Sequence, residues 1–233
     1  MNVCIFRIPK EESISFPSSH CRHCGYSLKF YDLIPVLSYI FLRGKCRNCK
    51  EKISIQYPLL EIINTTFYIM LYMKLGLTID FFKYSTLISI LLVIGMIDFN
   101  TKYVYERTII FGLVMGIFFG GICWIKNGEY LQNHILGAII GFLIIYMIER
   151  ITGKMGGGDK EISAICGLFL GAKLIVFAVF SAIMIGGIIT IIFLIFKLRD
   201  GKDEIAFGPY LALGSIFAIF LGDKLIIYYL SLY

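Results

Sequence analysis

The chain contains apolar runs that are too long and too free of charge for the core of a soluble domain. The longest covers residues 174–196, 23 positions without Asp, Glu, Lys or Arg. Residues 108–125 and 131–148 form similar runs, separated by a short polar sequence, 126–129. A helix of about 20 apolar residues crosses the hydrocarbon core of a bilayer. These runs therefore predict transmembrane helices.

Further segments predict membrane crossings from less uniform sequences. They cover residues 58–77, 84–97, 161–172 and 207–230. With 58% hydrophobic and 16% charged residues, the chain is predicted to be an all-α polytopic membrane protein with about seven transmembrane helices. Residues 1–57 are predicted to form a small cytoplasmic domain, and residues 58–233 a membrane domain.

Lys and Arg fall mainly on one side of the predicted membrane. If residues 1–57 are cytoplasmic, 17 of the 22 Lys and Arg residues share that side, as the positive-inside rule expects. The five on the other side are Lys74, Lys83, Lys126, Lys173 and Lys224. The net charge of +6 is thus explained by topology and by contact with the lipid bilayer. No nucleic acid is expected as a partner.

Two aspartates lie at the ends of predicted membrane segments. Asp98 ends the uncharged run 84–97, and Asp159 follows Gly156, Gly157 and Gly158. An ionisable residue at a membrane edge is costly, so it indicates a functional site. The orientation places both carboxylates at the cytoplasmic face, and the glycines would let another backbone approach Asp159. The alternative is a helix-connecting turn with an interfacial aspartate.

Four cysteines in the polar N-terminal segment have the spacing of a metal site. Cys21 and Cys24 form one Cys-x-x-Cys pair, and Cys46 and Cys49 form another. Two such pairs supply four thiolates that close a tetrahedron around Zn²⁺ and leave no open position, so the pattern predicts a structural zinc ion. Disulfides are not expected in a segment that faces the reducing cytoplasm. The alternative is a set of free structural thiols.

These features together resemble the type IV prepilin peptidases. The resemblance rests on both cysteine pairs, on Ile97-Asp98, on Tyr57-Pro58-Leu59-Leu60-Glu61, on residues 207–214, and on Gly156-Gly157-Gly158-Asp159-Lys160, which is similar to that family's Gly-x-Gly-Asp motif. It implies an aspartyl protease domain over residues 58–233 with Asp98 and Asp159 as the catalytic pair. Gly156, Gly157, Gly158, Lys160 and Glu106 would be motif or supporting residues.

The resemblance also implies a location and a substrate. Family members are multi-pass proteins of the bacterial inner (cytoplasmic) membrane with the active site facing the cytoplasm. They cut the basic leader from prepilin or pseudopilin precursors, typically after a glycine. Many also methylate the new amino terminus with S-adenosylmethionine. This second activity would involve the N-terminal cytoplasmic region, with Glu61 as a candidate participant, although Glu61 suits an interfacial residue bonded to a neighbouring helix equally well.

The sequence departs from the family pattern in two places. Family members usually begin with a transmembrane helix that leads into a segment like Asn2-Val3-x-x-x-Arg7-x-Pro9, and with such a helix the protein would have about eight spans. The family's Leu-Pro-Asp after the first aspartate is Val104-Tyr105-Glu106 here. Glu106 keeps an acid at that position.

Two functions of other classes also place aspartates in membranes. A proton-coupled transporter would place its carboxylates near the midplane and often show repeated halves, and neither feature is visible in the sequence. A non-catalytic assembly protein with a structural zinc loop would tolerate the loss of either aspartate.

Overall fold

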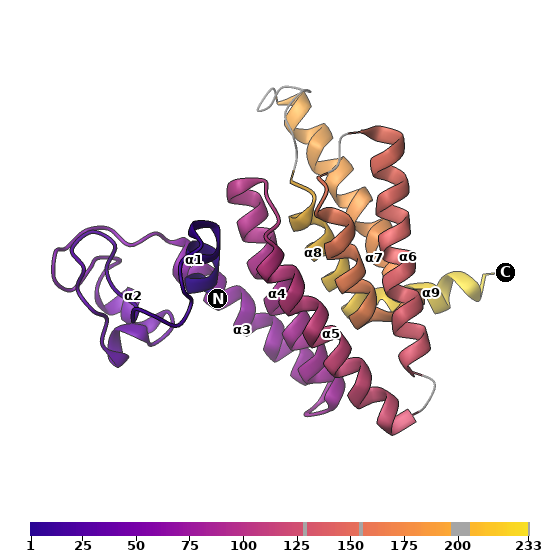
Figure 1. Ribbon diagram of the computed structural model, residues 1–233, viewed down its shortest axis with the longest axis horizontal. Helices are drawn as coiled ribbons and strands as arrows, with labels where there is room; N and C mark the ends of the chain where they lie inside the picture. Colours follow the sequence, from indigo (N-terminus) through magenta and orange to yellow (C-terminus); the bar gives the residue numbers. More distant parts are fainter. Residues whose placement is uncertain (128–129, 154–155, 197–205, 233) are drawn as a thin grey trace. The chain divides into compact units, whose positions relative to one another are not determined.

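The protein divides into two compact units, Met1–Gly76 and Leu77–Tyr233. The structure, a computed structural model, describes residues 1–127, 130–153, 156–196 and 206–232. Helices are the regular secondary structure of both units, and no β-strand occurs among these residues (Figure 1). Of the cations that orient the chain, Lys154, Lys197, Arg199 and Lys202 lie outside the described residues. The predicted domain boundary after residue 57 stays a prediction.

The first unit consists of short helices and turns followed by one long helix. Its elements are α1 (Asn2–Arg7), the 3₁₀ turns η1 (Ile8–Lys10) and η2 (Phe30–Leu33), α2 (Leu37–Phe41) and α3 (Gln56–Leu75). The buried guanidinium of Arg7 organises the loop after α1, because it donates hydrogen bonds to the carbonyls of Ser13 (3.0 Å) and Pro17 (2.8 Å). These bonds compensate the burial of its charge.

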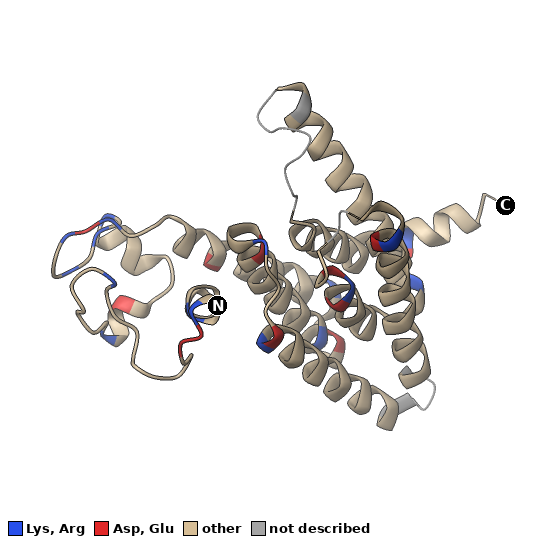
Figure 2. Cartoon of the chain, turned by 45° about the horizontal axis from the view of Figure 1, so that its top comes forward, with Lys and Arg blue, Asp and Glu red and all other residues tan. Residues whose placement is uncertain are grey.

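The second unit is built from long apolar helices. They are α4 (Ile79–Thr101), α5 (Glu106–Asn127), α6 (Tyr130–Thr152), α7 (Asp159–Ile195), α8 (Gly208–Phe217), the π-helical turn η3 (Ala218–Gly222) and α9 (Asp223–Leu230). In the part of the chain that the structure describes, five segments are long and apolar enough to cross a membrane: Ile79–Thr101, Glu106–Ile125, Leu131–Thr152, Asp159–Phe193 and Gly208–Leu230. Most of their length carries no charged residue (Figure 2). On α5, the large side chains of Ile110, Val114 and Phe118 are exposed, as suits contact with lipid.

α7 reverses its direction at Gly171, where φ is 79° and the backbone leaves the helical region. Gly141 of α6 contacts both arms. Its carbonyl accepts a hydrogen bond from the hydroxyl of Ser163 (2.9 Å), and a Cβ placed on Gly141 would lie 2.9 Å from Cγ1 of Ile175. Twelve residues of straight helix span about 18 Å, so residues 163 and 175 reach one glycine only because the chain folds back between them. The predicted segments 161–172 and 174–196 lie in these two arms.

Small residues let the helices of this unit approach closely. Gly137 of α6 meets Gly167 in the first arm of α7, and a Cβ on either glycine would overlap the backbone of the other. Gly214 of α8 meets the backbone of Ala178 in the second arm in the same way. Such small-residue contacts are typical of helix packing in membranes. The alternating helix directions bring the end of α4 and the starts of α7 and α8 to the same end of the unit.

Candidate active site and metal centre

Asp98 lies in the last turn of α4, and its side chain is held by the start of α8. The helix ends because Lys102 adopts a left-handed conformation (φ 57°) and donates its N–H to the carbonyl of Asp98 (2.7 Å). The residue is only 4% exposed, and its Oδ2 accepts the backbone N–H of Gly208 (2.9 Å). Pro209 follows in the first turn of α8, where a helix needs no N–H donor. The start of α8 thus presents a backbone donor to the carboxylate.

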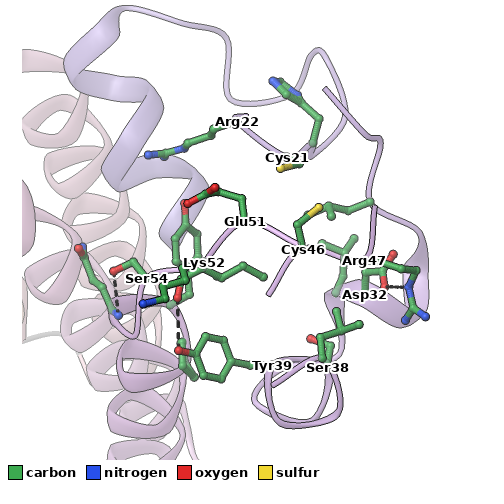
Figure 3. A pocket seen from close by; sticks show the side chains of 18 of the residues that line it. Cys21, Arg22, Asp32, Ser38, Tyr39, Cys46, Arg47, Glu51, Lys52 and Ser54 are labelled. Atoms are coloured by element: carbon green, nitrogen blue, oxygen red, sulfur yellow. Dashed lines mark hydrogen bonds and ion pairs between the residues drawn. The ribbon is translucent and has the colours of Figure 1, made fainter. Parts of the chain in front are cut away.

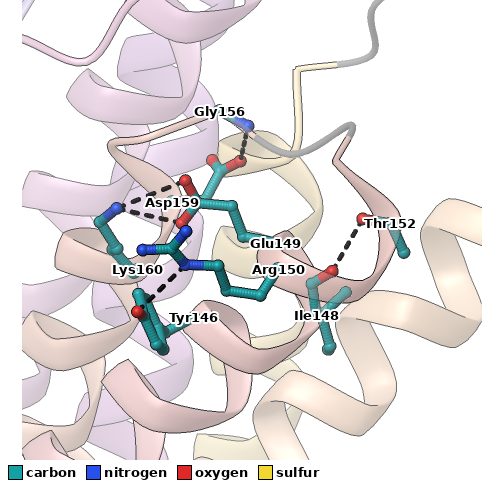
Figure 4. A network of polar contacts seen from close by, with 8 residues as sticks. All are labelled: Tyr146, Ile148, Glu149, Arg150, Thr152, Gly156, Asp159 and Lys160. Carbon is teal, nitrogen blue, oxygen red and sulfur yellow. Dashed lines mark hydrogen bonds and ion pairs between the residues drawn. The ribbon is translucent and has the colours of Figure 1, made fainter.

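Asp159 is the first residue of α7 and is 3% exposed. Its Oδ2 accepts the backbone N–H of Gly156 (3.1 Å), and its own N–H donates to the carbonyl of Gly156 (3.1 Å) (Figure 4). The side chain and backbone of Asp159 therefore close the turn that precedes α7.

The two carboxylates form one electrostatic site. The negative charge of Asp98 acts on Asp159, and so does the charge of Glu149. Two buried carboxylates that interact do not readily carry two negative charges at once. The ionised member of such a pair can take a proton from water, and the protonated member can donate one.

The glycine run before Asp159 permits a close approach of two loops. A Cβ on Gly158 would overlap the side chain of Val104, which lies in the loop after α4. A Cβ on Gly156 would lie 3.4 Å from Oδ2 of Asp159, whereas Gly157 faces open space. None of the three has a positive φ. Gly158 is therefore needed for the close packing of the two loops, rather than for a left-handed backbone.

Within the described part of the chain, the side chains of the predicted supporting residues Lys160 and Glu106 form no hydrogen bond or ion pair with either aspartate. Lys160 forms an ion pair with Glu149 (3.0 Å), with the two side chains 23% and 25% exposed. Figure 4 shows this pair beside Tyr146, whose hydroxyl accepts a hydrogen bond from Arg150 (3.0 Å). Lys160 thus offsets the charge of Glu149, the acid that acts on Asp159. Glu106 begins α5 and is exposed.

The four predicted metal ligands come together in the first unit. The sulfur atoms of Cys21, Cys24, Cys46 and Cys49 all lie within 4.8 Å of one another. A tetrahedral zinc ion with Zn–S bonds of about 2.3 Å separates its sulfurs by about 3.8 Å, and Sγ of Cys21 lies 3.8 Å from Sγ of Cys49. The four thiols therefore fit a structural zinc ion.

The two Cys-x-x-Cys pairs share one local fold. In each, the first cysteine donates its N–H to the carbonyl five residues later: Cys21 to Tyr26 and Cys46 to Glu51, both at 2.8 Å. The residue four positions after the first cysteine is left-handed in both, namely Gly25 (φ 70°) and Lys50 (φ 61°). This turn points both thiols of a pair in one direction.

Backbone donors prepare some of these thiols to bind a cation. The backbone N–H of Tyr26 lowers the pKa of the Cys24 thiol to about 6, and the backbone N–H of Cys49 lowers the pKa of Cys46. The N–H of Glu51 favours the Cys49 thiolate, but desolvation and the other three thiols raise its pKa to about 12. A divalent cation would offset the repulsion among four thiolates.

An ion pair ties the segment between the two cysteine pairs to the second pair. The side chain of Asp32 is 2% exposed and accepts a hydrogen bond from Nε of Arg47 (2.8 Å). Asp32 precedes the second pair by 14 residues and follows the first by eight. The contact therefore holds the segment between the pairs against the second turn.

Glu61 bonds to a loop, rather than to a neighbouring helix. Its Oε2 accepts the backbone N–H of Val36 (3.1 Å). Val36 has a φ of 60° and a ψ of −48°, a conformation that is rare for a β-branched residue. Strain of this kind persists only where the surroundings hold it. Glu61 supplies part of that support for the turn before α2.

Gly208, Val104 and Glu149 belong to the site around the aspartates, yet no role for them follows from the sequence alone. The available signal was the Gly-Pro pair at 208–209, because proline in the first turn marks a helix start. Nothing local indicated that this helix would begin beside Asp98.

Two family comparisons cover most of the chain. Residues 1–75 match the Bacterial Peptidase A24 N-terminal domain, and residues 85–191 match the Type IV leader peptidase family. The first match contains all four clustered cysteines and Glu61, and the second contains Asp98 and Asp159. No solved structure matches the chain.

Curated relatives align over nearly the whole length. The chain is 31% identical over 227 residues to the prepilin leader peptidase/N-methyltransferase of Bacillus subtilis (strain 168), covering 97% of this chain and 90% of that protein. It is 27% identical over 221 residues to the protein of the same name from Pseudomonas putida, covering 91% and 75%. The Myxococcus xanthus protein of that name is 30% identical over 207 residues, covering 86% and 61%.

Proposed function

Because the chain belongs to the type IV leader peptidase family, we propose that it removes the leader from prepilin-like precursors with Asp98 and Asp159 as its catalytic pair. The family makes it a peptidase, and its apolar helices make it a multi-pass membrane protein. The observation that carries the catalytic assignment is the burial of two electrostatically coupled carboxylates, each held by a backbone N–H, at one end of the helical unit.

In the proposed reaction the two aspartates divide acid and base roles. The ionised carboxylate takes a proton from water, which attacks the scissile carbonyl, and the protonated carboxyl donates to the carbonyl oxygen. A proton then returns to the departing amine as the peptide bond breaks. The pair shares its protons as a unit, so neither role is assigned to one residue. The N–H donors of Gly208 and Gly156 keep both carboxylates in place during these transfers.

The proposed topology places this reaction at the cytoplasmic face of the bacterial inner membrane. Support comes from the excess of Lys and Arg on the predicted cytoplasmic side. The fold-back of α7 at Gly171 supports counting its two arms as separate membrane segments. With α3, α4, α5, α6 and the segment Gly208–Leu230, the arms give about seven spans. The basic leader of the precursor would then remain on the side where Asp98 and Asp159 meet.

The first unit is proposed to hold a structural zinc ion and to serve methyl transfer. Cys21, Cys24, Cys46 and Cys49 would hold the ion and fix the turns on which they lie. The relatives carry N-methyltransferase in their names. We therefore assign to this unit the S-adenosylmethionine-dependent methylation of the new amino terminus, with Glu61 as a participant.

Leader removal is tested with the chain in membranes and a pilin-like precursor. Mass spectrometry of the products should show a shortened precursor whose new amino terminus follows the basic leader. Membranes without the chain serve as the control. A precursor that stays intact under conditions in which a relative cuts it would overturn the proposal.

A further inference from the structure

The short helix α2 of the first unit exposes an apolar face. Leu37, Ile40 and Phe41 lie three and four positions apart, so they share one side of the helix. All three side chains are exposed to solvent. Neighbouring large apolar side chains that are exposed in this way mark a contact with a membrane or a partner. We call these three residues the α2 patch.

The opposite face of α2 is already in use inside the unit. Ser38 and Tyr39 line a pocket of about 440 Å³ in the first unit (Figure 3). The Tyr39 hydroxyl donates to the carbonyl of Ile53 (3.3 Å). A Cβ placed on Gly44 would lie 2.9 Å from the same hydroxyl oxygen. These contacts fix the rotation of α2 about its axis, so the α2 patch stays on the outside of the unit.

Two hydrogen bonds hold α2 beside the start of α3. The N–H of Val36, at the N-cap of α2, donates to Oε2 of Glu61 (3.1 Å). Glu61 lies five residues into α3, about 8 Å along its axis. The bond from Tyr39 reaches Ile53, three residues before α3 begins. In the proposed topology α3 crosses the bilayer, so the α2 patch lies close to the level at which that crossing begins.

The exposed charges around the α2 patch are positive. Within residues 29–45 they are Lys29, Arg43 and Lys45. The acid of this stretch, Asp32, has a side chain that is 2% exposed and takes part in an ion pair. Cations at a membrane surface are attracted by anionic lipid headgroups, whereas a basic leader peptide would be repelled by them. The charge around the patch is therefore complementary to an anionic bilayer.

The backbone of α2 suits a less polar environment than water. The N–H groups of Ile40, Leu42 and Gly44 each donate to a carbonyl four or five residues earlier, at 2.9–3.0 Å. A backbone donor without a partner is costly in a membrane, and these three donors do not need water. The apolar side chains can therefore enter the membrane interface without leaving these donors unpaired.

We infer that the α2 patch docks the first unit on an anionic membrane leaflet, with its apolar side chains in the interfacial layer and the neighbouring cations at the lipid phosphates. This inference rests on the proposed function, because it needs α3 to cross the membrane from the cytoplasmic side. α3 would already hold the unit at the surface, so a small patch is sufficient for docking. The rival occupants are the precursor and a second copy of the chain.

A tryptophan in the α2 patch can report contact with lipid. The chain contains one tryptophan, Trp124, so Phe41→Trp is the only reporter in a Trp124→Phe background. The protein is placed in vesicles of phosphatidylglycerol and phosphatidylcholine, with and without bromine on the acyl chains. Bromine quenches a tryptophan that lies close to it. Emission from position 41 should fall about twofold or more in the brominated vesicles, because an interfacial side chain reaches the acyl chains.

Phe16→Trp in the same background is the matched control. Phe16 is 79% exposed and Phe41 is 83% exposed, and both belong to the first unit. Residues 11–19 around Phe16 contain Glu11 and Glu12 but no Lys or Arg. Emission from position 16 should change little with brominated lipid. Equal quenching at the two positions, or no quenching at position 41, would overturn the inference.

Lys29→Gln combined with Lys45→Gln tests the cations. Each cation near an anionic leaflet strengthens binding about fivefold, so the double variant should lose most of the quenching at position 41. Vesicles of phosphatidylcholine alone should have the same effect on the unchanged cations. Lys10→Gln combined with Lys74→Gln removes equal charge at exposed positions outside this stretch, and it should keep the quenching. Quenching that none of these changes affects would overturn the anionic leaflet as the occupant.

Folding is checked by far-ultraviolet circular dichroism of each variant. Ile40→Trp is a second reporter for the same patch if Phe41→Trp does not fold, and the same quenching is expected from it. Emission at position 41 that depends on the ratio of protein to lipid, but not on bromine, would identify a second copy of the chain. A response to added precursor alone would identify the precursor. Either result overturns the inference.

An epitope tag after Gly76 separates this inference from the proposed function. The tag should lie outside, because α3 is proposed to cross the membrane before it. A tag outside with no quenching at position 41 overturns the docking and leaves the proposed topology intact. A tag in the cytoplasm defeats the proposed crossing of α3, whatever the quenching.

Discussion

Gly208 and Asp98 lie 110 residues apart in the sequence and share a buried hydrogen bond of 2.9 Å. The donor is a backbone N–H at the start of α8, so its direction is fixed by the helix and by Pro209 in the first turn. The acceptor is one of the two proposed catalytic carboxylates. The position of Asp98 therefore depends on the absence of a side chain at residue 208.

Gly208→Ala should reduce leader cleavage about 100-fold, because a Cβ would lie 2.6 Å from Oδ2 of Asp98 and push the carboxylate aside. Gly121→Ala is the matched control, since no atom lies within 4 Å of a Cβ at that helical glycine. Cleavage rates are compared at equal protein abundance in membranes. A Gly208→Ala rate equal to that of the control would show that this contact does not set the geometry of Asp98.

Asp98→Asn and Asp159→Asn should each reduce cleavage by about 1000-fold or more, because an amide can neither take the proton from water nor exchange the shared proton. The double variant should be no slower than the slower single variant, since the two residues act as a unit. Asp223→Asn, at an exposed aspartate, should cleave normally. Near-normal cleavage by either single variant would make the pair assignment wrong and favour a non-catalytic assembly protein.

Lys160→Gln should reduce cleavage by less than about fivefold. Its ion pair with Glu149 is partly exposed, and such pairs contribute about 0.2–1 kcal/mol. Glu106→Gln should leave the rate close to wild type, because Glu106 is exposed and has no contact with either aspartate among the described residues. The same cleavage assay measures the rates of both variants. A loss at Glu106 as large as that of Asp98→Asn would add a third acid to the catalytic group.

The purified wild-type chain should contain about one zinc ion, and Cys46→Ser should lose most of it, because metal binding contributes directly to folding. Elemental analysis gives the zinc content. Limited proteolysis should then cut the segment between residues 20 and 55 faster in the variant. Cys4→Ser is the control, since Cys4 lies outside the cluster. A zinc-free wild-type chain with a protease-resistant segment would exclude the structural metal.

Epitope tags after Lys102 and after Asn127 should fall on opposite sides of the membrane. The predicted cytoplasmic side holds 17 Lys and Arg residues and the other side holds five. This asymmetry predicts Lys102 in the cytoplasm and Asn127 outside. Protease added to spheroplasts should therefore remove only the tag after Asn127. Protection of both tags in intact spheroplasts would require a new topology for α5.

The sequence was sufficient to propose the chemistry-bearing side chains, because each sits in a short local pattern. The Cys-x-x-Cys pairs specify four ligands within a few residues of each other, and the structure gathers their sulfurs within 4.8 Å. Asp98 and Asp159 stand out because a charge at the end of an apolar run is costly. Both side chains are buried in the structure, and their place at one membrane face stays a prediction.

The contacts that hold these side chains could not be predicted in the same way. The bond from Gly208 to Asp98 crosses 110 residues, and the close approach of Gly158 to Val104 joins two loops separated by two helices. Such pairings depend on how the helices pack. The periodicity of residues in one sequence does not show which distant segments will be in contact. The turn in α7 shows how far a predicted segment boundary lies from the observed one. Lys173 separates the two predicted segments, whereas the chain turns at Gly171, two residues earlier.

The contact between Gly137 and Gly167 joins the backbone of α6 directly to the arm of α7 that begins at Asp159. Backbone meets backbone at this crossing of α6 and α7, so no flexible side chain is present to absorb a displacement. Asp159 lies eight residues before Gly167, about 12 Å along the same arm. We therefore expect a tilt of α6 to move the arm of α7 that begins at Asp159. Since bilayer thickness acts on the tilt of membrane helices, we expect the cleavage rate to vary with the thickness of the bilayer around the chain.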